Sequence, residues 1–212
     1  MVALPPADLT GFPWTVVNAG TSLYRIVRHR DVSGDVRAGW HFSSAGDDHA
    51  GRFSLPKPDG TCHFSNLKYG GWLEVFRGCT LVDRADVDKR RLFTATRTGF
   101  PLRFGSLVSA RAVSYGVTLD LAAGNSYEQA QTWAAALHAA GRSGVVGLIR
   151  HDSAGKAHNV AVFGRSGPER RVAGWRTGTT EPVRHPDLLA DLRRMGIGVL
   201  DRPYDVTVTP VR

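Results

Sequence analysis

Three residues with complementary chemistry are evenly spaced within one short segment of the chain. Between Gly51 and Glu74, the residues Arg52, His63 and Glu74 follow one another at intervals of eleven, with turn-forming glycine and proline between them. A guanidinium is a planar fork that suits a pyrophosphate, and an imidazole hydrogen-bonds a ribose hydroxyl. A fixed carboxylate stabilises the positive charge that grows in a transition state. The segment therefore predicts a site for a phosphorylated ribosyl donor.

Each of these residues also has a purely structural interpretation. An arginine beside a turn is often a surface residue, and a histidine in a strand is often half-buried with a backbone partner. Glu74 lies in an apolar run, where an unpaired buried carboxylate is costly. It therefore either faces solvent or pairs with a cation such as Arg25 or Arg52. Local periodicity leaves these alternatives open.

Other catalytic patterns in the chain are weaker. Residues 150–153 contain the types of a hydrolytic triad, but triad members converge from separate elements and the G-x-S-x-G motif is missing. The spacings of His29-x-Asp31 and of His41 to His49 match no well-attested metal motif, so we expect no metal. The sequence also lacks a P-loop and a G-x-G-x-x-G fingerprint. A dinucleotide bound by this chain would therefore not use a Rossmann fold.

Composition and length are those of an ordinary soluble globular protein. The 212 residues suit one domain, and 42% hydrophobic and 22% charged residues are usual for such domains. No stretch approaches the roughly 20 apolar residues of a membrane span, and the N-terminal segment does not resemble a secretory signal. Cys62 and Cys79 are too few for a disulfide framework. We therefore expect a cytoplasmic protein with no membrane contact.

The net charge of +8 raises the question of a nucleic-acid partner. The basic residues are scattered over several short clusters, however, and show no helix-turn-helix or zinc-finger spacing. Direct nucleic-acid binding is therefore disfavoured. Attraction of an anionic small molecule, together with a solvated basic surface, accounts for the charge.

The apolar pattern predicts a mixed α+β domain. Glycine and proline are too frequent before residue 105 for long helices, and the regular βαβ alternation of a doubly wound fold is absent. The capping box of Asn125 and Glu128 begins the clearest helix, which ends at Gly141. The other predicted elements are strands within 14–42, 61–65, 91–97, 144–149, 159–163 and 205–210, and helices over 70–76 and 186–195.

Four features occur in this order along the chain: Tyr24-Arg25, the Gly51-Arg52-Phe53 turn, the strand from Gly60 that leads to Glu74, and the Gly144 strand after a Tyr127-x-x-x-Gln131 helix. In this order and spacing they resemble the RES domain, a family named for its arginine, glutamate and serine. The resemblance extends from about residue 20 to 165. We therefore expect a single RES-like domain over 1–212, with a C-terminal helix and strand in 166–212.

The resemblance implies a fold similar to that of ADP-ribosyltransferase toxins, in which a split, mixed sheet with flanking helices encloses an NAD cleft. NAD would be a substrate and not a prosthetic group. The implied reaction cleaves the nicotinamide–ribose bond by phosphorolysis, hydrolysis or transfer of ADP-ribose to a macromolecule. Family membership also implies a toxin neutralised by a cognate DNA-binding antitoxin, and a homodimer is compatible with the sequence.

Carried over by position, the resemblance gives each site residue a role. Arg25 and Arg52 match arginines that bind the phosphates and ribose of NAD, and Tyr24 accompanies them. Glu74 matches the glutamate that stabilises the oxocarbenium-like transition state, which makes Glu74 and Arg52 the expected catalytic pair.

Two positions depart from the family pattern. The family usually has tyrosine where this chain has His63, which keeps a ring and a hydrogen-bonding tip. The family serine falls at Ile149, which has no hydroxyl. Ser153 is the nearest serine and fills that position only if the end of the strand shifts. The family pattern therefore also leaves open a catalytically weakened relative that still binds NAD or a partner.

Overall fold

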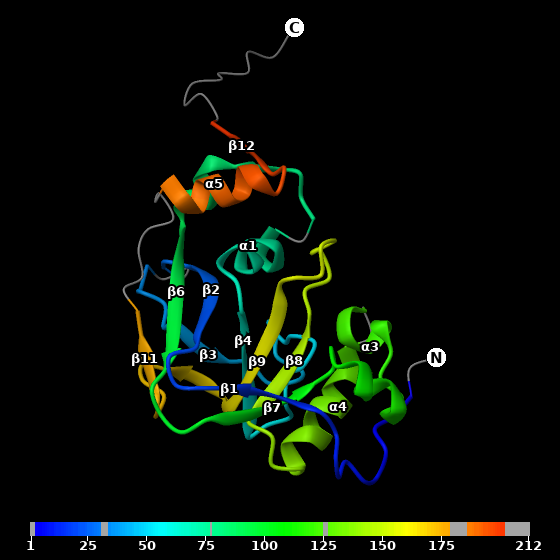
Figure 1. The fold of residues 1–212 in the computed structure, drawn as a ribbon. Coiled ribbons are helices and arrows are strands. Elements are labelled where there is room, and N and C mark those ends of the chain that lie inside the picture. The colour runs from blue at the N-terminus through cyan, green and yellow to red at the C-terminus, as the bar shows by residue number, and fades with distance from the viewer. Residues whose placement is uncertain (1–2, 31–33, 77, 125–126, 179–185, 202–212) are drawn as a thin grey trace, which may run out of the picture.

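A computed structural model describes residues 3–30, 34–76, 78–124, 127–178 and 186–201. Their central feature is a mixed sheet of eight strands, in which only the β7–β8 pair is parallel (Figure 1). In spatial order the strands are β1 (Trp14–Val17), β7 (Leu102–Ser106), β8 (Gly144–Leu148), β9 (His158–Arg165), β4 (Asp59–Ser65), β2 (Ser22–Arg28), β6 (Arg90–Arg97) and β11 (Trp175–Thr177).

Two smaller sheets and several helices flank this sheet, which confirms the predicted α+β class. The antiparallel pair β3 (Trp40–Phe42) and β10 (Gly167–Glu169) and the parallel pair β5 (Leu81–Asp83) and β12 (Gly198–Leu200) form the small sheets. The helices are α1 (Lys68–Phe76), α2 (Arg84–Asp88), the 3-10 helix η1 (Ala110–Tyr115), α3 (Leu119–Ala123), α4 (Tyr127–Ala139) and α5 (Pro186–Arg194).

Most elements expected from the sequence are present, with ends that differ by a few residues. The helix expected over 70–76 is α1, and the helix expected to end at Gly141 is α4. The short helices between 84 and 123 were not predicted. The proposed cap at Asn125 and the strand expected over 205–210 lie outside the described residues. Within the described residues, no helix is both long enough and apolar enough to cross a membrane.

The large sheet is split between β2 and β4. These two strands are paired at a single position, Tyr24 with Ser65, whereas β2 pairs with β6 at seven positions and β4 pairs with β9 at seven. Helix α1 follows β4 and packs against β2 at this junction. A methyl group on Gly71 would lie 3.0 Å from the side chain of Ile26, so the close approach of helix and strand requires glycine there.

Hydrophobic clusters cover both faces of the sheet. On one face, α4 packs its buried Trp133 and Leu137 against β8 and β9 in a cluster that includes Phe53. On the other face, Trp40 is the centre of an aromatic group around β4. Because side chains alternate along a strand, Cys62 and Phe64 of β4 join the Trp40 group and His63 faces the opposite side.

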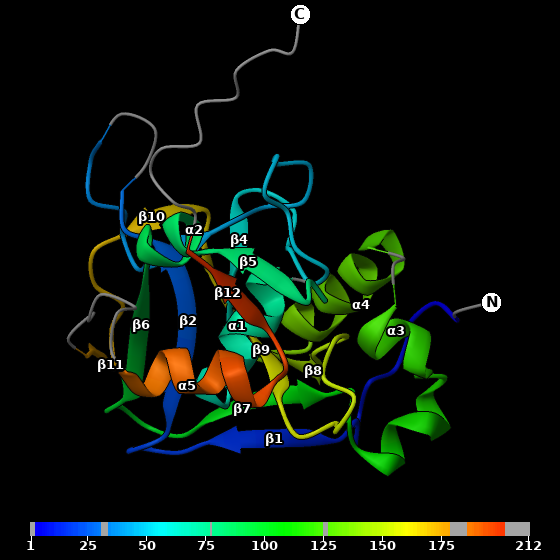
Figure 2. The same cartoon turned by 90° about the horizontal axis from the view of Figure 1, so that it is seen from above.

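A third cluster forms where the helices α1, α2 and α5 meet (Figure 2). It contains Trp72 and Phe76 of α1, whose rings stack 5.5 Å apart, together with Val87 and Leu192. These contacts fix the rotation of α1 about its own axis. The position of Glu74 in the same helix is thereby determined by packing.

Candidate functional site

A tight turn at residues 51–53 carries Arg52 and is fastened on two sides. The Phe53 ring is fully buried in the α4 cluster, and Gln131 of α4 donates from its Nε2 to the Gly51 carbonyl at 3.1 Å. The guanidinium of Arg52 binds backbone carbonyls, with Nη1 2.9 Å from the Ala122 oxygen and Nη2 3.1 Å from the Ala123 oxygen. Arg52 therefore caps the C-terminal end of α3, whose carbonyls lack partners within the helix.

The buried side-chain amide of Asn159, on β9, connects the other two predicted site residues, His63 and Glu74. His63 Nδ1 lies 3.2 Å from Oδ1 of Asn159, and Nδ2 of Asn159 donates to Glu74 Oε1 at 3.3 Å. His63 and Asn159 are on adjacent strands and point to the same face, since His63 is paired with Ala161 in the β4–β9 register. The network joins β4, β9 and α1 at the split in the sheet.

Arg52 is electrostatically coupled to this network. Burial lowers the pKa of the Arg52 guanidinium, and the nearby charges of Glu74 and Tyr127 oppose the change. The arginine remains charged because its ordinary pKa is above 12. Three of its five N–H donors are occupied by backbone carbonyls at Ala122, Ala123 and Leu148. The structure thus places Arg52, His63 and Glu74 on one side of the sheet.

His63 is held in the neutral form. Burial lowers the pKa of His63 to about 4, its hydrogen bond with Asn159 opposes this change, and the charges of Arg25 and Arg52 add to it. His63 Nε2 is buried against Gly51 and has no hydrogen-bond partner among the described residues. At neutral pH the imidazole therefore adds no charge to a site that already holds two arginines.

The depressed pKa of His63 makes stability depend on pH. Its folded value of about 4 lies below the ordinary 6.5, so between these values the unfolded chain binds more protons than the folded chain. The free energy of unfolding should therefore fall as the pH is lowered from 6.5 toward 4, by roughly 1 to 3 kcal/mol from this group. Urea denaturation at several pH values measures the slope. In His63→Gln this contribution to the slope should vanish, and an unchanged slope contradicts the assignment.

Arg25 and Tyr24 lie across the split, on β2. Arg25 Nη1 donates to Cys62 Sγ at 2.8 Å and lies 3.3 Å from the Gly39 carbonyl oxygen. Since Cys62 and His63 point to opposite faces of β4, Arg25 reaches the split from the Trp40 side. It is still close enough to lower the pKa of His63. Tyr24 lies at the one paired position between β2 and β4, with the Lys68 ammonium 6.0 Å from the centre of its ring.

The two positions considered for the family serine, Ile149 and Ser153, lie in different surroundings. Ile149 is 2% exposed and packs in a small apolar cluster with Leu73, whereas Ser153 is exposed in the following turn. The hydroxyl of Ser65 lies near Ile149, since a methyl group on Gly70 of α1 would lie 2.1 Å from Ser65 Oγ and 2.8 Å from Ile149 Cδ1. A serine hydroxyl is thus present beside Ile149, but it comes from β4.

The residues at 150–153 do not form a catalytic triad. Asp152 folds its own loop, accepting hydrogen bonds from the backbone N–H groups of Ala154, Lys156 and Ala157, and the Tyr69 hydroxyl binds the same carboxylate. Ser153 points to solvent in the same turn. Among the described residues, no group of three or more histidine, cysteine, aspartate or glutamate side chains is arranged to hold a metal ion.

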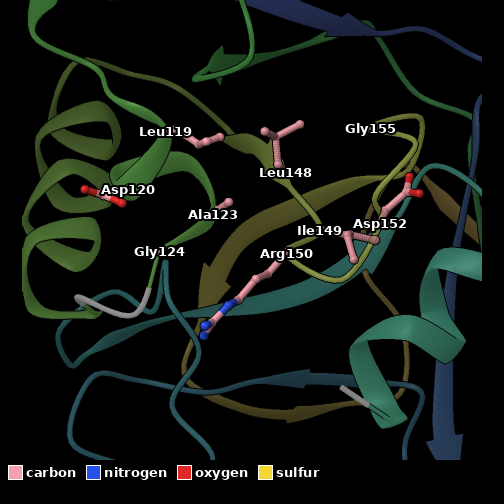
Figure 3. Close-up of a pocket in the computed structure, with 9 residues that line it drawn as sticks. All are labelled: Leu119, Asp120, Ala123, Gly124, Leu148, Ile149, Arg150, Asp152 and Gly155. Atoms are coloured by element: carbon pink, nitrogen blue, oxygen red, sulfur yellow. The ribbon is translucent and has the colours of Figure 1, made fainter. Parts of the chain in front are cut away.

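A cavity of about 440 Å³ is lined in part by residues whose backbone carbonyls bind Arg52. It lies between α3 and the loop after β8, with Leu119 and Ala123 on one side and Ile149 and Asp152 on the other (Figure 3). Its walls include Ala123 and Leu148, whose carbonyl oxygens bind Arg52. The side chains of Arg52, His63 and Glu74 are not among the lining residues. The cavity is therefore related to Arg52 through the backbone carbonyls of Ala123 and Leu148.

Sequence reasoning missed the contribution of Asn159. The sequence predicts Asn159 only as the first residue of an apolar strand, and in the structure the residue is 6% exposed. The one signal available was a polar residue at the start of an otherwise buried run. Gln131 belongs to the Tyr127-x-x-x-Gln131 pattern of the sequence, and its hydrogen bond to the Gly51 carbonyl supplies a physical reason for that spacing.

Comparisons with known proteins give a fold but no family. No family model matches the sequence, and no curated protein matches it. The structure is similar to a chain in the crystal structure of the M. tuberculosis MbcT–MbcA toxin–antitoxin complex, with a TM-score of 0.55 and 16% sequence identity. The match covers 82% of this chain and 92% of the other. At 16% identity the likeness establishes a shared fold, and any inference about the chemistry must come from the site residues themselves.

Proposed function

We propose that this chain is a RES-like enzyme that consumes NAD by cleaving its nicotinamide–ribose bond. The observation that carries the proposal is the convergence of Arg52, His63 and Glu74 beside the split between β2 and β4. These residues come from three separate elements. A purely structural role for each of them does not require that they meet.

The chemistry of the proposed reaction fits the charges at the site. The bond between C1′ of the ribose and the nicotinamide nitrogen breaks, and nicotinamide leaves as a neutral base with the bonding electrons. Positive charge then develops on the ribose, and the Glu74 carboxylate stabilises it more than it stabilises the ground state. A phosphate oxygen, a water or a macromolecular nucleophile completes the reaction at C1′. If the nucleophile is water, a proton is released.

The two arginines suit the pyrophosphate of NAD. Arg52 retains N–H donors beyond those bound to backbone carbonyls, and burial strengthens their interaction with an anion. Arg25 approaches the split from β2. Arg52 contributes positive charge from the His63 face of the sheet and Arg25 contributes it from the opposite face, and both charges act on His63.

The proposal includes a protein partner. The structurally similar chain belongs to a toxin–antitoxin complex, and an NAD-consuming enzyme endangers its own host unless it is restrained. We therefore expect a cognate antitoxin that covers the site. Co-purification with the product of a neighbouring gene, and loss of NAD cleavage on adding it, would support this partner.

The decisive assay follows NAD and its products in vitro. Purified protein should release nicotinamide from NAD, with phosphate present in one reaction and omitted from another. Dependence on phosphate, with a phosphorylated ADP-ribose product, indicates phosphorolysis. Free ADP-ribose indicates hydrolysis, and label retained on protein or nucleic acid indicates transfer. If NAD stays intact with phosphate, without phosphate and after a macromolecular acceptor is added, the enzymatic proposal is wrong.

Ile149 favours one alternative, a relative that binds NAD without turning it over. Its apolar side chain stands where the family serine is expected. In that case NAD should still raise the melting temperature, because a ligand of the native state stabilises it by mass action. A melting temperature that does not respond to NAD excludes this alternative as well.

A further inference from the structure

The amide of Asn159 is bonded at both ends to residues of the proposed site. Its Nδ2 donates to Glu74 Oε1, and its Oδ1 lies 3.2 Å from His63 Nδ1. The side chain is 6% exposed, and its backbone is held in the β8–β9 and β4–β9 ladders. Asn159 is therefore a rigid connection between the carboxylate and the imidazole.

The chemistry of these groups fixes the direction of each hydrogen bond. An ionised carboxylate only accepts, so the amide nitrogen of Asn159 must face Glu74. The amide oxygen then faces His63, and an oxygen accepts from a ring N–H. His63 must therefore carry its proton on Nδ1, which leaves an unshared electron pair on Nε2.

The surroundings of Nε2 favour the same tautomer. Nε2 is buried against Gly51, so close that a methyl group on that residue would lie 2.3 Å from it. The charged groups that influence His63 are Arg25 on β2 and Arg52 in the 51–53 turn, with Glu74 of α1 acting through the amide. A lone pair next to the turn that carries the Arg52 cation is favourable, whereas an N–H there would be repelled.

We propose that Asn159 is a positioning residue that locks His63 with its proton on Nδ1 and holds Glu74 in place by the same amide. This inference builds on the proposed function, because Glu74 and His63 are the residues being positioned. Its central claim, the tautomer, is a property of the free protein and does not require NAD. Asn159 acts through its two neighbours, and no contact with substrate is claimed for it.

Nitrogen-15 NMR of the histidine rings near pH 7 tests the tautomer directly. The chain has eight histidines, and the His63 signals are identified by their loss in His63→Gln. We expect the proton on Nδ1 and an unprotonated Nε2. A ring protonated on Nε2, or an even mixture of tautomers, overturns the inference whether or not the protein cleaves NAD.

Two variants separate positioning from general support of the fold. Asn159→Leu removes both hydrogen bonds and should weaken the preference of His63 for the Nδ1–H tautomer, so that a measurable fraction of the ring is protonated on Nε2. Asn159→Asp retains an acceptor for Nδ1–H but repels Glu74, so it should keep the tautomer and misplace the carboxylate. Val160→Ala is the matched control, because it perturbs the same strand on the face away from the network. It should leave the tautomer unchanged.

Kinetics of NAD cleavage supply a second measurement. Both Asn159 variants should lower kcat by roughly 10- to 100-fold with a smaller change in KM, as expected when a reacting group is misplaced by about an ångström. If Asn159→Leu keeps the Nδ1–H tautomer to the same extent as the parent, or if the variants change kcat no more than Val160→Ala does, Asn159 has no positioning role. If the parent protein shows the tautomer but leaves NAD intact, the proposed function fails and the assignment of the tautomer stands.

Discussion

Replacing Glu74 with glutamine should lower the rate of nicotinamide release from NAD by about 100-fold or more while leaving the protein folded. Glutamine retains an oxygen that accepts from Asn159 Nδ2, so the local geometry survives. The negative charge is lost, and with it the stabilisation of the positive ribose in the transition state. Preorganised electrostatic groups of this kind contribute about 10²- to 10³-fold to a rate.

The loss should appear mainly in kcat, since the carboxylate acts on charge that is absent from the ground state. Glu169→Gln, an exposed change on β10, is a suitable control and should leave the rate unchanged. A melting curve shows whether each variant is folded. Activity within a few-fold of the parent in Glu74→Gln would mean that another group supports the transition state.

Gly51→Ala should damage both stability and activity, because it forces a methyl group into the His63 ring. The added Cβ would lie 2.3 Å from Nε2 and 2.8 Å from Cδ2 of the imidazole. Such overpacking costs about 1–3 kcal/mol. Either the ring or the turn that carries Arg52 must move, and a displacement of about an ångström can lower activity by about 100-fold. Urea denaturation and nicotinamide release measure the two effects.

A double-mutant cycle with His63→Ala tests this explanation. If the clash with the ring is the cause, Gly51→Ala should cost little stability in a protein that already lacks the imidazole. The coupling energy between the two positions would then be large, as for residues in direct contact. Equal costs of Gly51→Ala in both backgrounds would place the strain elsewhere in the turn.

The sequence was sufficient to predict the α+β class and the elements that carry the three central residues. The strand around His63 and the helix around Glu74 follow from local patterns, because alternation and glycine placement are properties of a few adjacent residues. The short helices between 84 and 123 were missed, since brief helices carry too few turns for a periodic signal. One of them, α3, supplies carbonyls that Arg52 binds.

The connection between the site residues was beyond local reasoning. Asn159 reaches His63 only because β9 pairs with β4 in a particular register, and a single sequence does not reveal that register. The same holds for Arg25, whose contact with Cys62 depends on how two strands lie at the split. From the sequence, Ser153 could occupy the family serine position only if the end of the preceding strand shifted. The structure instead places Ser65 beside Ile149 from a different strand.

The single paired position between β2 and β4 affects the free-energy cost of separating these two strands. Elsewhere in the sheet, parting two strands would break several backbone hydrogen bonds, each expensive to leave unsatisfied. Between β2 and β4 there is little ladder to break, and apolar contacts such as those of α1 with Ile26 maintain the separation. Separating the two strands along this line therefore breaks fewer backbone hydrogen bonds than elsewhere in the sheet, and substitutions in α1 should change how closely β2 and β4 approach each other.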